Sequence, residues 1–293
     1  MKFYKSCPVC NSKKIVKKEE VKDLFLSKEN FSLYECKDCQ VLFTNPRPED
    51  KELGKYYDSE EYLSHNTKNN GIFGKTYALL RQFNIQRKFK IVHNLVNNGR
   101  ILDIGCGTGE LLNYFQQRNW ECEGIEPNIK AREFAKTKYH LNVYDESHIR
   151  KIQNENFDII SMWHVLEHVP DINKRMEEVQ RLLKKKGYLI IAIPNLTSWD
   201  AGFYKTYWAG YDVPRHLYHF SPEAFKLFAN KHNYQIISML PLKLDSYYVS
   251  FLSEKYLKNH FQPVRAFWNG LRSNLAGRKT KNYSSLIYVL KKL

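Results

Sequence analysis

A glycine-rich segment that follows a short apolar run could bring the polypeptide backbone close to a ligand. The run Ile101–Ile104 leads into Gly-Cys-Gly-Thr-Gly at 105–109. Glycine has no side chain, and the helix expected next offers free N–H groups to polar or anionic atoms. The third glycine comes one residue too early for the dinucleotide fingerprint, in which the preceding aspartate has no counterpart either. The candidate cofactor contacts are Asp103, Gly105, Cys106, Gly107 and Gly109.

A second candidate lies at the end of the next expected strand, where Gly124-Ile125 is followed by Glu126 and Pro127. A carboxylate at that point can accept hydrogen bonds from both hydroxyl groups of a ribose. The alternative is an ordinary surface glutamate, which the spacing from the glycine segment disfavours. We therefore expect Glu126 and Pro127 to lie at the same cofactor.

The segment Phe157–Val169 combines a strand pattern with two histidines. Its apolar half predicts a strand that delivers the following loop to the sheet edge where ligands bind in α/β folds. Met162 and Trp163 are predicted to contact the cofactor and His164 the acceptor. His168 is predicted to be a general base, with a packed structural histidine as the alternative. His164 and His168 could also bind a metal ion together, but no third ligand lies at a matching spacing in the sequence.

These segments resemble the class I S-adenosylmethionine-dependent methyltransferases. Leu102–Gly109 matches the first motif of that family, and Phe157–His168 is similar to its fourth-strand motif, which ends in Leu-Glu-His. The resemblance covers residues 97–293. It implies S-adenosylmethionine as the cofactor.

The same resemblance implies a role for three acidic positions. Asp103 would hold the methionine end of S-adenosylmethionine, and Glu126 would bind the ribose. The adenine contact would fall on Asp145, with Glu146 as the alternative.

The segment Tyr211–Ser221 is rich in aromatic and histidine side chains, and such a loop past a strand end can cover an acceptor pocket. It is similar to a segment of sugar C-methyltransferases that also begin with a four-cysteine zinc module. His216 matches their histidine, which implies a second base, whereas Val213 and Arg215 replace their Tyr and Glu. Arg215 favours an anionic acceptor. The predicted substrate contacts here are Tyr211, Arg215 and His219, and the alternative is a packed aromatic corner.

Four of the six cysteines form two Cys-x-x-Cys pairs in the first forty residues. Each pair can aim two thiolates at one ion, and two pairs complete a tetrahedral site that favours Zn²⁺. A redox role is the rival interpretation, but it fits two pairs poorly. The predicted ligands of a structural zinc ion are Cys7, Cys10, Cys36 and Cys39.

The formal net charge is +15, and part of it lies in the basic, aromatic segment 245–284. Phe261, Val264, Phe267, Trp268 and Leu271 are spaced for one face of a helix. That face could touch a membrane surface or an anionic substrate, or it could pack on its own domain. Nucleic acid is not the expected partner, because no motif for a flipped base is present. With no apolar run long enough to span a bilayer and no secretion signal, a cytoplasmic protein is expected.

Strand patterns alternate with helix patterns after Gly99, which predicts a doubly wound α/β domain with a seven-stranded, mostly parallel sheet. The expected strands are Ile101–Ile104, Cys122–Ile125, Leu141–Tyr144, Phe157–Met162, Tyr188–Ile193, Tyr234–Leu240 and Ser285–Leu290. A helix is expected over Asp171–Lys186, and another over Lys75–Val96 with Leu79, Phe83 and Phe89 on its apolar face. We divide the chain into a zinc-ribbon-like module (1–45), a helical linker or cap (46–96) and a methyltransferase domain (97–293).

The expected function is methyl transfer from S-adenosylmethionine to a small molecule, such as a sugar or a glycan precursor. The alternatives are a methyltransferase for a lipid, a quinone or a nucleic acid, and a non-catalytic protein that binds the cofactor without turnover.

Overall fold

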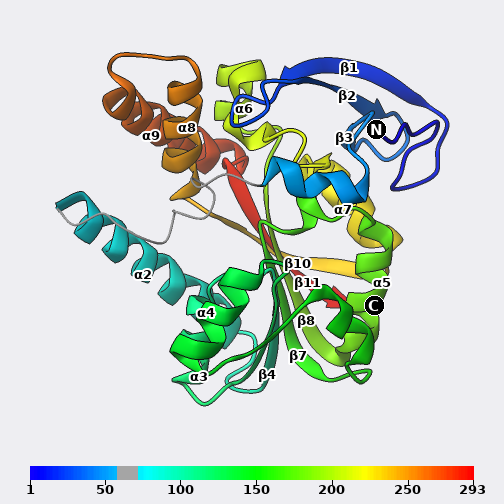
Figure 1. The fold of residues 1–293 in the computed structure, drawn as a ribbon, viewed down its shortest axis with the longest axis vertical. Coiled ribbons are helices and arrows are strands. Elements are labelled where there is room, and N and C mark those ends of the chain that lie inside the picture. Colours follow the sequence, from blue (N-terminus) through cyan, green and yellow to red (C-terminus); the bar gives the residue numbers. More distant parts are fainter. Residues whose placement is uncertain (58–71) are drawn as a thin grey trace.

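The larger sheet lies at the centre of a computed structural model that describes residues 1–57 and 72–293 (Figure 1). Within the described residues it has seven strands in the order β10-β11-β8-β7-β4-β5-β6. β11 pairs antiparallel with both β10 and β8, and the other strand pairs of the described sheet are parallel. The strands are β4 (Arg100–Ile104), β5 (Glu121–Ile125), β6 (Asn142–Tyr144), β7 (Phe157–Trp163), β8 (Leu183–Pro194), β10 (Tyr234–Pro241) and β11 (Ser285–Lys292). The predicted α/β fold with a seven-stranded, mostly parallel sheet is confirmed.

Helices cover both faces of this sheet because successive strand residues point to opposite sides. Leu102 and Ile104 of β4 pack into one apolar core, and Ile101, which precedes Leu102, packs into the other. The first core contains α5 (Ile172–Leu182) and α7 (Pro222–Lys231). The second contains α2 (Ile72–His93), α3 (Glu110–Gln116) and α4 (Ile129–Tyr139).

Side-chain caps fix where several of these helices begin. The side chains of Asn128, Asp171 and Ser221 accept hydrogen bonds from the first turns of α4, α5 and α7. Each cap satisfies a backbone N–H that has no partner inside its helix.

The N-terminal part forms a second sheet, in the order β1-β2-β3-β9 within the described residues. Its strands are β1 (Ile15–Lys22), β2 (Asn30–Cys36), β3 (Leu42–Thr44) and β9 (Tyr218–His219). The last strand comes from the segment that we expected to cover the acceptor, so the N-terminal module borrows a strand from residues 97–293. A 3₁₀ helix, η1 (Asp50–Tyr56), follows in the expected linker, of which residues 58–71 lie outside the described part.

Two helix predictions need correction. The helix expected over Asp171–Lys186 ends at Leu182, because Leu183 pairs with Phe157 and continues as strand β8. An ion pair between Lys184 and Asp158, 2.8 Å long, supports the extended course.

The second correction concerns the face of α2 that packs on the sheet. Leu79 and Phe83 are 72% and 58% exposed, whereas Phe89 and Val92 pack on the core around β4 and α3. Phe83 and Phe89 are six residues apart, which separates them by about 120° around a helix with 3.6 residues per turn, so they do not share a face.

Between β10 and β11 the chain forms α8 (Asp245–Tyr256) and α9 (Gln262–Thr280), which lie side by side at the upper left of Figure 1. A shorter helix, α6 (Trp199–Tyr204), contacts both of them. Among the described residues, no helix is long and apolar enough to cross a membrane.

Candidate functional site

The glycine segment between β4 and α3 forms one wall of a cavity of about 330 Å³. Gly105, Gly107 and Gly109 have φ values of +74°, +56° and +77°, which L-residues with side chains rarely adopt. A Cβ atom at Gly105 would lie 2.3 Å from Val165, so the backbone turns tightly against the loop after β7. A Cβ atom at Gly107 would meet nothing within 4 Å. The loop is therefore compact at its base and open at Gly107.

Asp103 lies at the bottom of this cavity, where Ser161 donates a hydrogen bond of 2.6 Å to its carboxylate. Burial raises the pKa of Asp103 to about 6, against the opposing effects of this hydrogen bond and of the Lys88 charge. Lys88, on α2, places its ammonium 4.4 Å from the centroid of the Trp163 ring. Burial lowers the pKa of Lys88, and the charges of Asp103 and Asp245 oppose that shift.

Glu126 follows β5 and braces the glycine segment. Its two carboxylate oxygens accept hydrogen bonds from the backbone N–H groups of Gly107 (2.9 Å) and Asn128 (2.8 Å). Burial raises the pKa of Glu126, although both hydrogen bonds favour the ionised form. A carboxylate oxygen can accept more than one hydrogen bond, so this carboxylate can also receive a hydroxyl group.

The remaining predicted cofactor residues lie in different surroundings. Trp163 and Cys106 line the cavity. The side chain of Met162 is fully buried in the core on the other face of the sheet, because it alternates with Trp163 along β7. Pro127 is exposed, and its carbonyl accepts a hydrogen bond from Arg132.

Asp145, the predicted adenine contact, caps η2 (Glu146–Lys151) through the backbone N–H of Ser147, 2.8 Å away. Hydrogen bonds from the Ser147 side chain and backbone lower the pKa of Asp145.

A second cavity, of about 250 Å³, begins at His164, the residue that follows Trp163. We call it the acceptor cavity. One wall comes from the segment 209–216, and another from α8. Its lining residues are Phe25, His164, Pro194, Ala209, Gly210, Asp212, Arg215, His216, Asp245, Tyr248, Val249, Leu252, Tyr256 and Ser285.

His164, which lines the acceptor cavity, lies between two carboxylates. Its Nε2 is 2.7 Å from Asp245 at the start of α8, and its Nδ1 is 3.3 Å from Glu167. Burial by itself would lower the pKa of His164, but Asp245 and Glu167 outweigh it and raise the pKa to about 10. Burial opposes ionisation of Glu167, yet His164 holds its pKa at about 2. His164 is therefore an imidazolium that ties α8 to the loop after β7.

The rings of His216 and His168 pack edge to face, with their centroids 4.5 Å apart, and we call them the histidine pair. The Nδ1 of His216 lies 2.9 Å from the Gly210 carbonyl, so in the neutral ring Nδ1 carries the proton and Nε2 has the lone pair. His216 lines the cavity, and His168 lies behind it, 3.1 Å from the Arg215 carbonyl and 3.0 Å from the Tyr57 hydroxyl. Burial and the neighbouring His216 lower the pKa of His168 to about 4.

Glu167 lies beneath this histidine pair. Ligand atoms of Glu167, His168 and His216 all lie within 4.8 Å of one another. Among the described residues, Oε2 of the buried Glu167 has no hydrogen-bond partner. The carboxylate can therefore compensate a positive charge on either ring, or the three side chains could hold a metal ion. His164 is not part of this candidate metal site, because both of its ring nitrogens already face carboxylates. The candidate ligands are therefore Glu167, His168 and His216, and not His164 with His168.

Three predicted substrate contacts serve mainly to hold the N-terminal module. Arg215 is 1% exposed and donates to Asp212, at 2.7 Å, and to Asp23 in the loop between β1 and β2, at 3.0 Å. With its charge compensated, Arg215 is not the free cation that an anionic acceptor would need. Tyr211 donates to Glu19 of β1 at 3.0 Å.

The third of these residues is His219. Its ring is buried in β9, outside the lining of the acceptor cavity, and burial lowers its pKa to about 3.

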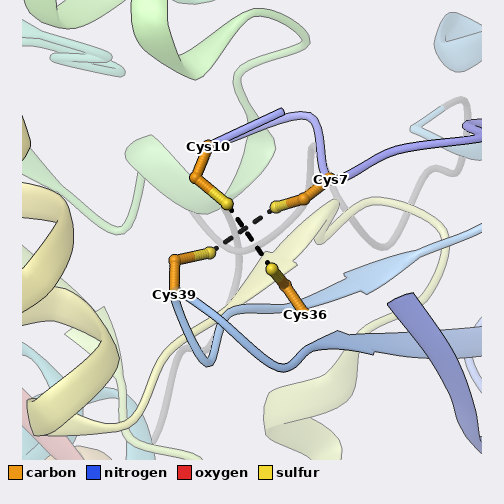
Figure 2. A group of neighbouring side chains, drawn as sticks. All are labelled: Cys7, Cys10, Cys36 and Cys39. Atoms are coloured by element: carbon orange, nitrogen blue, oxygen red, sulfur yellow. Dashed lines mark hydrogen bonds between the residues drawn. The ribbon is translucent and has the colours of Figure 1, made fainter. Parts of the chain in front are cut away.

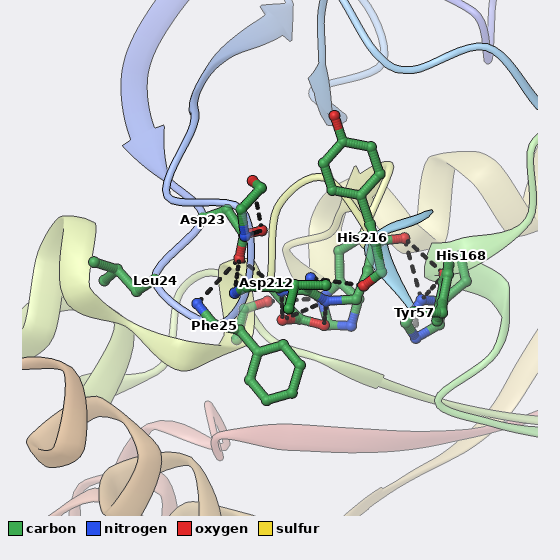
Figure 3. Close-up of polar contacts among 12 residues, drawn as sticks. Asp23, Leu24, Phe25, Tyr57, His168, Asp212 and His216 are labelled. Atoms are coloured by element: carbon green, nitrogen blue, oxygen red, sulfur yellow. Dashed lines mark hydrogen bonds and ion pairs between the residues drawn. The ribbon is translucent and has the colours of Figure 1, made fainter. Parts of the chain in front are cut away.

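The N-terminal module contacts His216 through Thr44. Thr44 donates its hydroxyl to the His216 carbonyl at 3.0 Å, and its N–H to the Leu217 carbonyl at 3.0 Å. Figure 3 shows Asp23 beside Asp212 and, further along the same network, His216, His168 and Tyr57. The position of His216 therefore depends on residues that lie far from it in the sequence.

The four cysteines of the N-terminal module converge on one point (Figure 2). Their sulfur atoms lie within 4.8 Å of one another, and the sulfurs of Cys7 and Cys39, like those of Cys10 and Cys36, are 3.5 Å apart. None of them forms a disulfide in the described structure. Zn–S bonds of about 2.3 Å put the sulfurs of a tetrahedral site about 3.8 Å apart, so the set fits Zn²⁺. We call the four cysteines and the turns that carry them the four-cysteine knuckle. It also contacts α5, where Asn173 donates to the Pro8 carbonyl at 2.9 Å.

Sequence reasoning missed several residues of the site. Asp245, Tyr57 and Asp23 lie 81, 111 and 192 positions from their partners His164, His168 and Arg215. Lys88 lies on another element than Asp103 and Asp245, the two carboxylates that it faces. Each is an ordinary helix or loop residue in its local sequence, so no local pattern pointed to them.

Comparison with known proteins identifies the central part of the chain. Residues 78–239 match the model of the family described as methyltransferase domain. A ubiquinone biosynthesis O-methyltransferase from Rhodopseudomonas palustris is 35% identical over 101 residues, which is 33% of this chain and 40% of that protein. The chain thus spans less than half the length of this curated relative.

Solved structures show the same fold. A SAM-dependent methyltransferase from Archaeoglobus fulgidus aligns over 72% of this chain and 94% of its own, with 19% identity and a TM-score of 0.50. The PH0226 protein from Pyrococcus horikoshii aligns over 82% of this chain and 99% of its own, with 12% identity and a TM-score of 0.51.

Proposed function

Because the chain belongs to the methyltransferase domain family, we propose that it transfers a methyl group from S-adenosylmethionine to a small molecule held in the acceptor cavity. The observation that carries this proposal is that two successive residues, Trp163 and His164, line two different cavities, one beside the glycine segment and one beside His216. A donor and an acceptor can then meet in line, and such positioning supplies much of the rate enhancement in a displacement reaction.

The cofactor cavity offers what S-adenosylmethionine requires. Asp103 can face the ammonium group of the methionine part, which would keep this carboxylate ionised despite its burial. Glu126 can accept from the ribose hydroxyls, and the open Gly107 lets the backbone approach the ligand. When bound, S-adenosylmethionine supplies an electrophilic methyl group on a sulfonium.

His216 is the base that the geometry favours. Its Nε2 lone pair belongs to a residue of the cavity lining and can take the proton that an acceptor hydroxyl loses. Glu167 then compensates the imidazolium that forms. His168, which the sequence suggested first, positions the His216 ring from behind.

The acceptor that fits best is a sugar or a glycan precursor. The cavity is small and combines a polar wall, with His216 and Asp212, and an aromatic wall, with Tyr248 and Tyr256. Sugar rings present hydroxyl groups at their rim and C–H groups on their faces, which suits such a pair of walls. A quinone precursor or another lipid head group is the second candidate, because Phe25 and Leu252 add apolar surface.

The four-cysteine knuckle is proposed to hold one structural zinc ion. All four ligands are cysteines, which leaves no open position for a substrate. Metal analysis of the purified protein should return one zinc per chain. A second equivalent that is lost on replacing Glu167 would place a metal between His168 and His216 and refute the assignment of His216 as the base.

Calorimetry tests the central proposal. S-adenosylmethionine and its demethylated product should both bind to the purified chain with one site, and absence of binding would refute the cofactor assignment. Incubation with S-adenosylmethionine and either nucleotide-linked sugars or dihydroxybenzenes should release the demethylated product with the sugars. Turnover with the dihydroxybenzenes alone would favour the second candidate.

A further inference from the structure

Large apolar side chains of α8 and α9 point into solvent instead of into the protein. Phe261 is 74% exposed and Trp268 is 54% exposed, values that are unusual for side chains of this size. We call this set the α8–α9 face. It consists of Tyr248, Phe251, Leu257, Phe261, Val264, Phe267, Trp268 and Leu275.

The packing of α9 explains why its aromatic side is free. The buried side of this helix carries only small or polar residues, namely Ala266, Asn269, Gly270, Ser273 and Gly277. A Cβ atom at Gly270 would lie 2.6 Å from the Tyr247 ring, so the two helices approach too closely for a larger residue. A helix of a globular protein normally buries its large apolar residues. Here that side faces outward, so packing within the domain does not account for it.

All exposed charged side chains between residues 246 and 281, the stretch that forms this face, have the same sign. Between residues 246 and 281, all of which the structure describes, the only acidic residue is Glu254, which is fully buried. Tyr204, Arg265 and Asn269 surround its carboxylate. The exposed charged side chains of this stretch are Lys255, Lys258, Arg265, Arg272, Arg278, Lys279 and Lys281.

We propose that the α8–α9 face docks on a membrane surface that contains anionic lipids. Aromatic side chains insert at the level of the lipid head groups, and surrounding Lys and Arg side chains bind the negative surface. A second copy of this chain fits less well, because a symmetric contact would bring two sets of cations together without acidic partners.

Docking would also place the acceptor cavity at the membrane, an extension that rests on the proposed function. Val249 and Leu252 of α8 line that cavity, and Tyr248 both lines it and belongs to the α8–α9 face. An acceptor whose reactive head group is carried on a lipid could enter the cavity while its tail stays in the bilayer. The volume of about 250 Å³ suits a head group and not a lipid chain.

Vesicle binding by the full chain tests the docking surface. The protein should sediment with phosphatidylcholine vesicles that contain phosphatidylglycerol and stay in solution with phosphatidylcholine alone. The double variant Phe261→Ser/Trp268→Ser should bind at least about tenfold more weakly, because it removes two inserted aromatic rings. The double variant Arg278→Gln/Lys279→Gln should also bind at least about tenfold more weakly, because each cation near an anionic surface contributes a severalfold gain.

Matched controls carry the same changes at exposed positions elsewhere. Ile129→Ser on α4 and Lys185→Gln/Lys186→Gln on β8 should leave vesicle binding unchanged. Equal loss in these controls, or wild-type protein that does not sediment with anionic vesicles, would refute the proposal. So would a stable dimer that Phe261→Ser/Trp268→Ser dissociates. Calorimetry with S-adenosylmethionine in the same samples separates this outcome from failure of the proposed function, because the cofactor cavity lies outside α8 and α9.

Discussion

The two cavities of this protein are constructed in different ways. The cofactor cavity lies where β4 and β7 end, and most of its lining comes from the strand ends, the glycine segment and α2. The acceptor cavity needs the loop after β1, the segment 209–216 and α8, none of which belongs to the parallel core of the sheet. The first cavity is thus built from the strand ends and the helices that pack on them, whereas the second exists only when three separate parts are docked. Changes in those three parts should therefore affect the acceptor without affecting the cofactor.

The largest effect is expected at the glycine segment. Gly107→Arg should abolish binding of S-adenosylmethionine, because the new side chain would enter the open space at the cavity wall. Calorimetry measures this loss. Gly107→Ala adds little volume, but alanine adopts the positive φ of this position less readily than glycine does. This variant should bind S-adenosylmethionine more weakly than the wild type without losing binding. Gly202→Arg, which adds the same side chain in open space on α6, should bind normally.

Removal of zinc should disrupt the acceptor cavity and leave the cofactor cavity intact. A chelator, or Cys36→Ser, should unfold the knuckle and abolish methyl transfer, because β3 and Thr44 would no longer hold His216. The affinity for S-adenosylmethionine should stay within about twofold, since changes at distant sites are usually independent. Turnover and calorimetry on the same sample give both values. Loss of both together would contradict the division into an intrinsic and an assembled cavity.

Replacement of the base should slow the chemical step alone. His216→Gln should lower kcat by about 10²- to 10⁴-fold, the usual contribution of a general base, with little change in cofactor affinity. His168→Gln should have a smaller effect, because it removes a supporting ring. Steady-state kinetics compare the two variants, and a larger effect at His168 would reverse their proposed roles.

A more graded effect is expected from the ion pair that joins the N-terminal module to the segment 209–216. Asp23→Asn leaves the buried Arg215 with only Asp212 as a carboxylate partner. Loss of one partner of a buried pair typically destabilises a protein by about 3–5 kcal/mol, and the remaining partner should reduce that cost here. Thermal unfolding and kcat should both decline, whereas Glu20→Gln, at an exposed pair on β1, should change neither.

The smallest effect concerns pH. The folded pKa of His164 is about 10, above the ordinary value of 6.5, so its contribution to stability is fully present below pH 6.5 and is lost as the pH rises toward 10. The difference in Tm between wild type and His164→Gln should therefore shrink from pH 6 to pH 10. A difference that grows over this range would contradict the imidazolium between Asp245 and Glu167.

The same contrast explains how much could be predicted from the sequence. The seven strands and the glycine segment follow from patterns within about ten residues, and the structure confirms them. The roles of Arg215 and Tyr211 could not be predicted, because their partners Asp23 and Glu19 each lie 192 positions away. The sequence could not predict which face of α9 is buried either. The structure shows that Gly270 and its neighbours, and not the aromatic residues, pack on α8.

Strand β9 has a consequence for the order in which the chain can fold. It supplies only Tyr218 and His219, yet it completes a sheet whose other strands lie within the first 44 residues. A ribosome makes the cysteine pairs long before it makes their last strand partner. The cysteines can thus bind the metal ion before β3 pairs with β9, a pairing that closes a long loop at a large cost in chain entropy. The zinc ion would then act as a nucleus that holds three strands ready for the fourth, so metal supply during synthesis should set the yield of competent protein.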